Sequence, residues 1–203
     1  MIYVGPLEQD GSEMFATFAT VILTIESASA EPKITEKFNY YDVSGSTVQE
    51  LRADLNRKRP SDKDGKHFDA VTRWYIRWHY DYRTGSNQCA IASVSTTVNV
   101  TITFPRLSES ADTPGAVKQA FADYTQKLLL HEKGHAQNAI DTAKRIDDGI
   151  AALRPLGTCA GLGQAANSLG YSLIEAANQW DIDYDLRTRH GATQGARFPR
   201  SGE

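Results

Sequence analysis

Two neighbouring segments in the middle of the chain alternate strictly between apolar and polar residues. In residues 72–83, every second side chain is large and apolar, and the residues between them are mostly charged; the apolar set is Trp74, Ile76, Trp78, Tyr80 and Tyr82. Residues 90–104 alternate in the same way, with Ser, Thr and Asn at the polar positions. A period of two is typical of strands with one buried face. With the turn at 84–88, these segments predict a long antiparallel hairpin whose aromatic stripe belongs to the core.

A longer period follows the hairpin. Residues 116–153 contain no proline, and apolar residues recur every third or fourth position, as in Ala136, Ile140, Ala143, Ile146, Ile150 and Leu153. This spacing predicts an amphipathic helix, which the proline at position 114 would open. After a break at 155–163, a second helix is expected over 164–180, and a polar, irregular tail from Asp181 onward.

The segment before the hairpin predicts one further strand and one further helix. Residues 37–43 read as a strand, and Ser46 or Thr47 can cap a helix that reaches about Arg57. Strands and helices that segregate along the chain in this order indicate an α+β fold. We expect a single domain over 31–203, in which the long helix packs on the aromatic face of the hairpin, as in a zincin-like arrangement.

The first thirty residues predict an N-terminal leader. Residues 14–25 are apolar apart from threonines, and Ala28-Ser29-Ala30 resembles a signal-peptidase site. The leading residues are acidic rather than basic, which is atypical for a signal peptide, and an N-terminal strand is the alternative. We expect a signal peptide over 1–30 and a secreted or periplasmic protein. The apolar run is too short for stable membrane insertion.

Composition adds two expectations. The net charge is −3 and the chain has no basic block, so nucleic acid is not expected as a partner. Cys89 and Cys159 are the only cysteines. An even pair in an exported protein predicts one disulfide, and two buried free thiols are the alternative.

The candidate chemistry lies in the long helix, in His131-Glu132-Lys133-Gly134-His135. This is an H-E-x-x-H motif, whose histidines lie four apart and therefore on one helical face. Two imidazoles so placed can bind one Zn2+, and Glu132 between them can act as general base on water. Gly134 weakens the helix by about 1 kcal/mol relative to alanine, but its bare backbone would let another element approach closely. The alternative is a surface helix with two incidental histidines.

A catalytic zinc site needs a third protein ligand. The metzincin continuation is absent, because Asn138 and Asp141 stand where that motif has glycine and histidine. We favour His190, because its neutral ring suits zinc and the glycine-rich tail would let it reach the helix. The alternatives are Glu175, Asp183 and Asp185.

Two polar side chains outside the motif need an interpretation. Tyr184 is a candidate donor to the oxyanion of a tetrahedral intermediate, and simple packing is the alternative. His79 falls on the polar face of its strand, so we expect it to be solvated rather than to bind metal.

The chain resembles a bacterial family of predicted secreted zinc-dependent proteases, also known as domain of unknown function nine-two-two. The resemblance covers about residues 37–195 and rests on these segments: Tyr40-Tyr41-Asp42-Val43-Ser44-Gly45, Trp74 with Trp78, Cys89, residues 130–135, and Asp185-x-x-Thr188-x-His190-Gly191. It implies a secreted, zinc-dependent, peptidase-like protein and little about the substrate. The acidic start of the chain departs from an ordinary exported member.

The expected function is therefore a zinc metallopeptidase acting on a peptide or protein substrate, with His131, His135 and His190 as metal ligands. One alternative is a zinc hydrolase of a non-peptide amide, for instance in cell-wall material. The other is a non-catalytic module whose metal site is structural or lost. An edge of the hairpin could bind peptide by strand addition.

Overall fold

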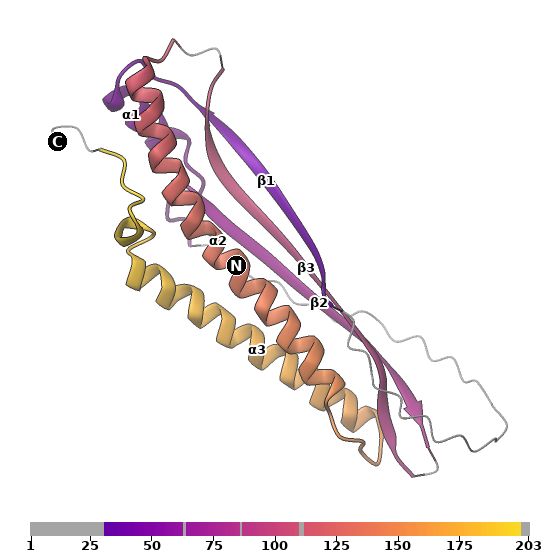
Figure 1. Ribbon diagram of the computed structural model, residues 1–203. Helices are drawn as coiled ribbons and strands as arrows, with labels where there is room; N and C mark the ends of the chain where they lie inside the picture. Colours follow the sequence, from indigo (N-terminus) through magenta and orange to yellow (C-terminus); the bar gives the residue numbers. More distant parts are fainter. Residues whose placement is uncertain (1–30, 63, 86, 110–111, 200–203) are drawn as a thin grey trace.

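The computed structural model describes residues 31–62, 64–85, 87–109 and 112–199, so the leader expected over 1–30 lies outside the described residues. This part of the chain folds as α+β, with three long or medium helices and a three-stranded sheet (Figure 1). The elements in chain order are β1 (Lys33–Val43), α1 (Val48–Lys58), β2 (Val71–Thr84), β3 (Cys89–Leu107), α2 (Gly115–Ala151), α3 (Cys159–Thr188) and the short 3-10 helix η1 (Ala192–Gln194).

The sheet has the order β1-β3-β2 and is mixed. β2 pairs with β3 antiparallel, which confirms the hairpin, whereas β1 pairs with β3 parallel. The expectation of an antiparallel sheet was wrong for β1. The chain reverses once between β1 and β2 through α1, and again at the hairpin turn, so β3 runs in the direction of β1. The central strand is therefore β3, with the other two strands at the edges.

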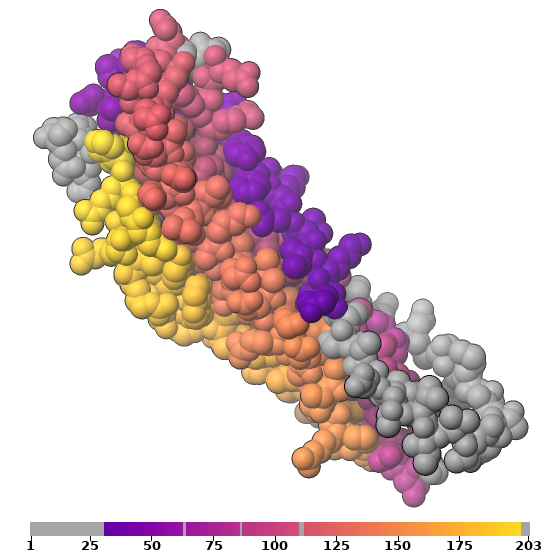
Figure 2. Space-filling view, viewed as in Figure 1, coloured from indigo at the N-terminus to yellow at the C-terminus, as the bar shows by residue number. Residues whose placement is uncertain are grey.

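Helices α2 and α3 lie along one face of the sheet, and Figure 1 shows them running side by side. The aromatic stripe of β2 faces them, and Trp74, Ile76 and Trp78 are buried there. The long helix thus packs on the aromatic face of the hairpin, as its amphipathic pattern predicts. In the space-filling view, the surface of α2 continues into that of α3, with β1 at its margin (Figure 2).

Two glycines allow α3 to approach the aromatic stripe closely. A Cβ at position 170 would lie 2.5 Å from the ring of Trp78, and one at position 163 would lie 2.3 Å from the hydroxyl of Tyr82. The start of α3 is also tied to the hairpin covalently, because Cys89 and Cys159 form a disulfide with Cα atoms 5.0 Å apart. The predicted disulfide is confirmed.

The expectation of an irregular tail from Asp181 was wrong, because α3 continues to Thr188. Beyond residue 180, every third or fourth residue of α3 still faces the interior, but these residues are now mostly polar. The inward-facing positions are Ala177, Asp181, Tyr184, Asp185 and Thr188. These polar side chains are directed at α2, where they find partners. Within the described part of the chain, no helix is both long enough and apolar enough to cross a bilayer.

Candidate metal centre

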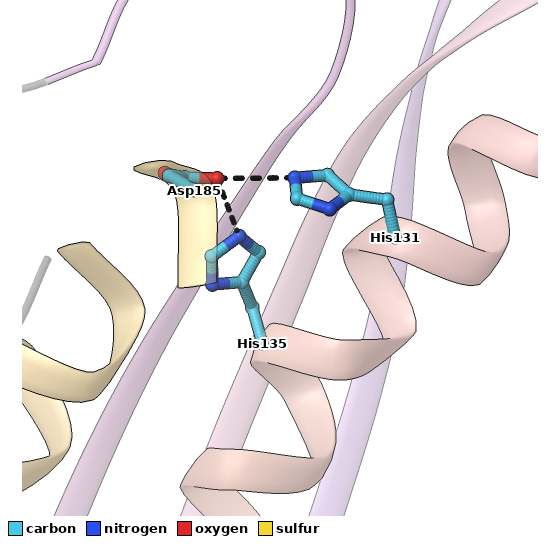
Figure 3. A group of neighbouring side chains, drawn as sticks. All are labelled: His131, His135 and Asp185. Carbon is cyan, nitrogen blue, oxygen red and sulfur yellow. Dashed lines mark hydrogen bonds and ion pairs between the residues drawn. The ribbon is translucent and has the colours of Figure 1, made fainter. Parts of the chain in front are cut away.

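The two motif histidines lie on the face of α2 that is directed at α3. His131 and His135 are 2% and 8% exposed. The Nε2 atoms of both rings lie 3.1 Å from the same oxygen, Oδ1 of Asp185 on α3 (Figure 3). One ligand atom from each of these three residues lies within 4.8 Å of the other two. The i, i+4 spacing on α2 thus places both rings opposite one carboxylate.

The Nδ1 atoms of both rings, which face away from Asp185, also have hydrogen-bond partners. Nδ1 of His135 lies 2.9 Å from Oδ1 of Asp181, one turn before Asp185 on α3. Nδ1 of His131 lies 3.0 Å from Oε1 of Gln194 in η1. Metal-binding histidines almost always use their second nitrogen in this way, which fixes the orientation and tautomer of the ring. Both imidazoles are therefore oriented with Nε2 toward a common point.

Asp181 is itself positioned by two donors. The indole Nε1 of Trp74 on β2 donates to Oδ2 of Asp181 at 2.8 Å, and Nδ2 of Asn138 on α2 donates to Oδ1 at 3.0 Å. The carboxylate that orients His135 is therefore held by the sheet and by α2. This support ties the geometry of the cluster to the packing of β2, α2 and α3.

Strong electrostatic coupling links the members of the cluster. Burial would lower the pKa of His135, but its contacts with Asp181 and Asp185 raise the pKa to about 10. Burial would raise the pKa of Asp185, but hydrogen bonds from His131, His135 and His190 hold it well below its usual range. A divalent cation bound between these groups would meet the same carboxylates that raise the pKa of His135, and its binding would require that imidazole to be neutral. This donor set fits zinc.

Glu132 lies beside this cluster in the interior. Its side chain is 4% exposed, and its Oε2 accepts a hydrogen bond of 2.6 Å from Oγ1 of Thr72 on β2. Burial raises the pKa of Glu132 above its ordinary value. The structure therefore places a buried carboxyl group, oriented by the hydroxyl of Thr72, next to the paired histidines.

Tyr184 packs directly on the motif. Its ring stacks on that of His131, with centroids 5.0 Å apart. Its hydroxyl accepts from Nε2 of Gln194 at 2.9 Å and lies 3.4 Å from the carbonyl oxygen of His131. A Cβ at position 134 would lie 2.4 Å from that hydroxyl, so Gly134 permits the close approach that the sequence predicts. These contacts give Tyr184 a packing role, and its role toward an oxyanion stays a prediction.

His190 adjoins the cluster without belonging to the group of three. It follows α3 with a φ of 50°, and its side chain is 50% exposed. Its Nδ1 lies 3.3 Å from Oδ1 of Asp185, and its ring packs against Phe68 at 4.6 Å between centroids. Asp185, one of the alternatives to His190, is the residue that stands opposite both motif histidines.

The other candidates lie away from the histidines. Glu175 is exposed on α3, and Asp183 accepts a hydrogen bond of 3.0 Å from Nε2 of Gln179. His79 is partly exposed, and its Nε2 lies 3.4 Å from Oδ1 of Asp81. None of these three belongs to the group of ligand atoms that the described residues form around His131 and His135.

Sequence reasoning missed the residues that support the two histidines. Asp181 could have been found, because it lies four residues before Asp185, one of the alternatives for the third ligand, on the inward face of α3. Thr72 and Gln194 carry no such signal, because their proximity to α2 depends on how the sheet and η1 pack against it.

Comparison with known proteins identifies a family but no function. A family model described as a bacterial protein of unknown function (DUF922) matches residues 38–191. Neither a curated protein nor a solved structure matches the chain. Because the family match covers well over half of the 203 residues, the chain belongs to the bacterial family DUF922.

Proposed function

We propose that this protein is a zinc-dependent metallopeptidase of zincin-like architecture, with His131, His135 and Asp185 as protein ligands. One observation carries the proposal: both Nε2 atoms converge on Oδ1 of Asp185 while Asp181 and Gln194 hold the opposite ring nitrogens. Two imidazoles and one carboxylate form a ligand set used by catalytic zinc, which keeps a fourth position for water or substrate.

The proposed chemistry divides between the metal and Glu132. A bound zinc ion would polarise the scissile carbonyl and lower the pKa of water toward neutrality. Glu132 would take the proton of the attacking water and pass it to the leaving amine. Thr72 holds Oε2 of Glu132 and so leaves Oε1 for that transfer. Buried surroundings strengthen each of these interactions, because water does not screen them.

The site opens to solvent on the side of Asp185 and His190, whose side chains are 31% and 50% exposed. A peptide or protein substrate could approach from there. The disulfide supports an oxidising compartment, so a secreted or periplasmic location forms part of the proposal.

A second candidate function rests on the position of His190. If its Nδ1, already 3.3 Å from Asp185, were a fourth ligand, the metal would be fully enclosed by protein. Structural zinc sites are closed in this way, whereas catalytic sites keep a position open. The protein would then be a metal-stabilised binding module.

The proposal is tested with the full chain loaded with zinc and a library of fluorogenic peptides. Wild-type protein should bind one equivalent of zinc and cleave at least one sequence in a chelator-sensitive reaction. Glu132→Gln should retain zinc and lose at least about 100-fold in rate, as removal of a general base requires. Glu175→Gln, which alters an exposed carboxylate, should be unaffected.

Three outcomes would redirect the proposal. Zinc binding without cleavage of any peptide, together with amide hydrolysis in cell-wall fragments, would favour the non-peptide substrate. Zinc binding without hydrolysis of either would favour the structural site. Unchanged turnover in Glu132→Gln would refute its role as general base.

A further inference from the structure

The sheet has a second face, directed away from α2 and α3, whose middle rows are polar. Residues paired across the three strands form successive rows on this face. Three consecutive rows are Lys33-Thr97-Arg77, Thr35-Asn99-Tyr75 and Lys37-Thr101-Arg73. We call these nine side chains the basic face. The alternate rows, such as the one of Ile76 and Val98, point to the helices and are buried at the hairpin.

The basic face carries four cations and no carboxylate, in a chain whose net charge is −3. The next carboxylate along this side of β2 is Asp81, four residues from Arg77, and it is paired with His79 and Ser93. All four cationic residues are exposed. Among the described residues, none of the four forms an ion pair with a carboxylate. A patch of one charge sign attracts and steers ligands of the opposite sign, so this separation of charge favours an anionic partner.

The two arginines are held in place by uncharged groups. Nη2 of Arg73 donates to the carbonyl oxygen of Ser61 at 2.6 Å. The guanidinium carbon of Arg77 lies 4.7 Å from the centre of the Tyr75 ring. These contacts orient the guanidinium groups without neutralising them, so less side-chain entropy is lost when an anion binds.

The spacing suits a linear polymer. Outer strands of a three-stranded sheet lie about 10 Å apart, and residues four apart on one strand are about 13 Å apart. The four cations therefore mark the corners of a flat area, and Thr97, Asn99 and Thr101 lie along its middle. A chain that crosses this area would meet separated positive charges with hydroxyl and amide groups between them.

We propose that the basic face binds a linear acidic polysaccharide. Hydroxyl and amide side chains between the cations match the alternation of hydroxyl and anionic groups along such a polymer. Single-stranded nucleic acid would need several aromatic rings for stacking, and the one ring here, Tyr75, is covered by Arg77. Cations alone attract an anionic lipid surface only weakly, and stable membrane binding needs an apolar anchor as well. These three rows contain no aliphatic side chain.

The test measures binding of the full chain to fluorescent polygalacturonate and to heparin at several salt concentrations. Wild-type protein should bind at least one of them, more weakly as salt rises, because screening weakens contacts between exposed charges. Polygalacturonate carries carboxylates and heparin also carries sulfates, so the preference identifies the anionic group. Arg73→Gln with Arg77→Gln should lower affinity at least tenfold.

The matched control is Lys118→Gln with Arg154→Gln, which removes two exposed cations in and just after α2, away from the basic face. Its affinity for either polymer should stay within about twofold of that of the wild-type protein. Thermal melts of both double variants should match wild type, since all four side chains are exposed. Equal losses in the two variants, or no binding to either polymer, would overturn the proposal. Tighter binding of DNA or of phosphatidylglycerol vesicles through the same arginines would overturn the assignment to polysaccharide.

Discussion

The ring of Tyr184 occupies the space that a side chain at Gly134 would fill. A Cβ there would lie 2.4 Å from the Tyr184 hydroxyl and 2.6 Å from its Cζ atom. The glycine inside the H-E-x-x-H motif therefore sets how closely α3 approaches α2. That approach determines whether Asp185 can reach both histidines.

Gly134→Ala should consequently destabilise the protein, although alanine favours helix by about 1 kcal/mol. Overpacking costs about 1–3 kcal/mol, and displacement of Tyr184 would also move His131, on which it stacks. We expect a lower melting temperature and weaker zinc binding by titration calorimetry. Gly115→Ala, at a position with open space, is the matched control. Adding Tyr184→Leu to Gly134→Ala should recover part of the loss; a fully additive double variant would contradict the steric explanation.

Substitutions at Asp185 and at His190 should have different effects on the metal content of the protein. Asp185→Asn should weaken zinc binding more than about 100-fold, beyond the losses typical of residues that only support a ligand. His190→Ala should retain about one equivalent, measured by mass spectrometry of the metal after dialysis, because catalytic sites use three protein ligands. Loss of metal in His190→Ala and retention in Asp185→Asn would assign the third position to His190.

Asp181 should act through His135 rather than on the metal. Asp181→Asn should lower zinc affinity about 10–100-fold, because the group that orients His135 loses its charge. It should also cost some stability, because Trp74 and Asn138 donate to different oxygens of Asp181 and the amide keeps only one of them. Asp183→Asn, two residues along the same helix, is the control and should bind zinc as wild type does. An unchanged affinity in Asp181→Asn would show that His135 needs no orienting carboxylate.

A buried network away from the metal centre should make stability depend on acid pH. Burial would raise the pKa of Asp69, but two 2.6 Å hydrogen bonds from Arg52 and one from Tyr124 lower it below its usual value. A carboxyl group whose pKa is lower in the folded state stabilises the protein fully when the pH is above its pKa in the unfolded chain, about 3.9. This contribution to stability is lost as the pH falls through the pKa of the folded state.

Asp69→Asn should therefore lower the free energy of unfolding by about 3 kcal/mol at pH 7, since it leaves Arg52 unpaired in a largely buried site. Between pH 5 and pH 3, denaturant titrations of this variant should show a smaller loss of stability than wild type. Asp64→Asn, at an exposed position, should follow the wild-type profile. If Asp69→Asn and the wild-type protein lost the same free energy of unfolding between pH 5 and pH 3, Asp69 would not be a cause of the acid sensitivity.

The sequence predicts the elements of the fold better than it predicts the site. Strict alternation in 72–83 and 90–104 specifies the hairpin, because each strand buries one face against the helices. The parallel pairing of β1 carries no local signal, since it depends on the path through α1. Within the site, His131, Glu132 and His135 are visible because helix geometry alone places them together.

The third position of the cluster illustrates why the sequence leaves Asp185 as one of several alternatives and does not indicate Asp181 as its neighbour in the site. The segment from Asp181 onward is polar, and this composition predicts an irregular tail, although α3 continues to Thr188. Asp181, Asp185 and Thr188 lie on the buried side of that helix because α2 presents imidazoles there. A polar residue at an inward helical position indicates a buried partner, and this partner cannot be seen from the segment alone.

Helix α3 is anchored at its two ends by different chemistry. Cys159, its first residue, is bonded to the hairpin, and Asp185 near its last turn faces the imidazoles of α2. These residues are 26 positions apart, which corresponds to about 39 Å of helix. The disulfide holds one end of a rigid rod and the contacts with the imidazoles hold the other, so loss of either attachment should loosen α3 from that end.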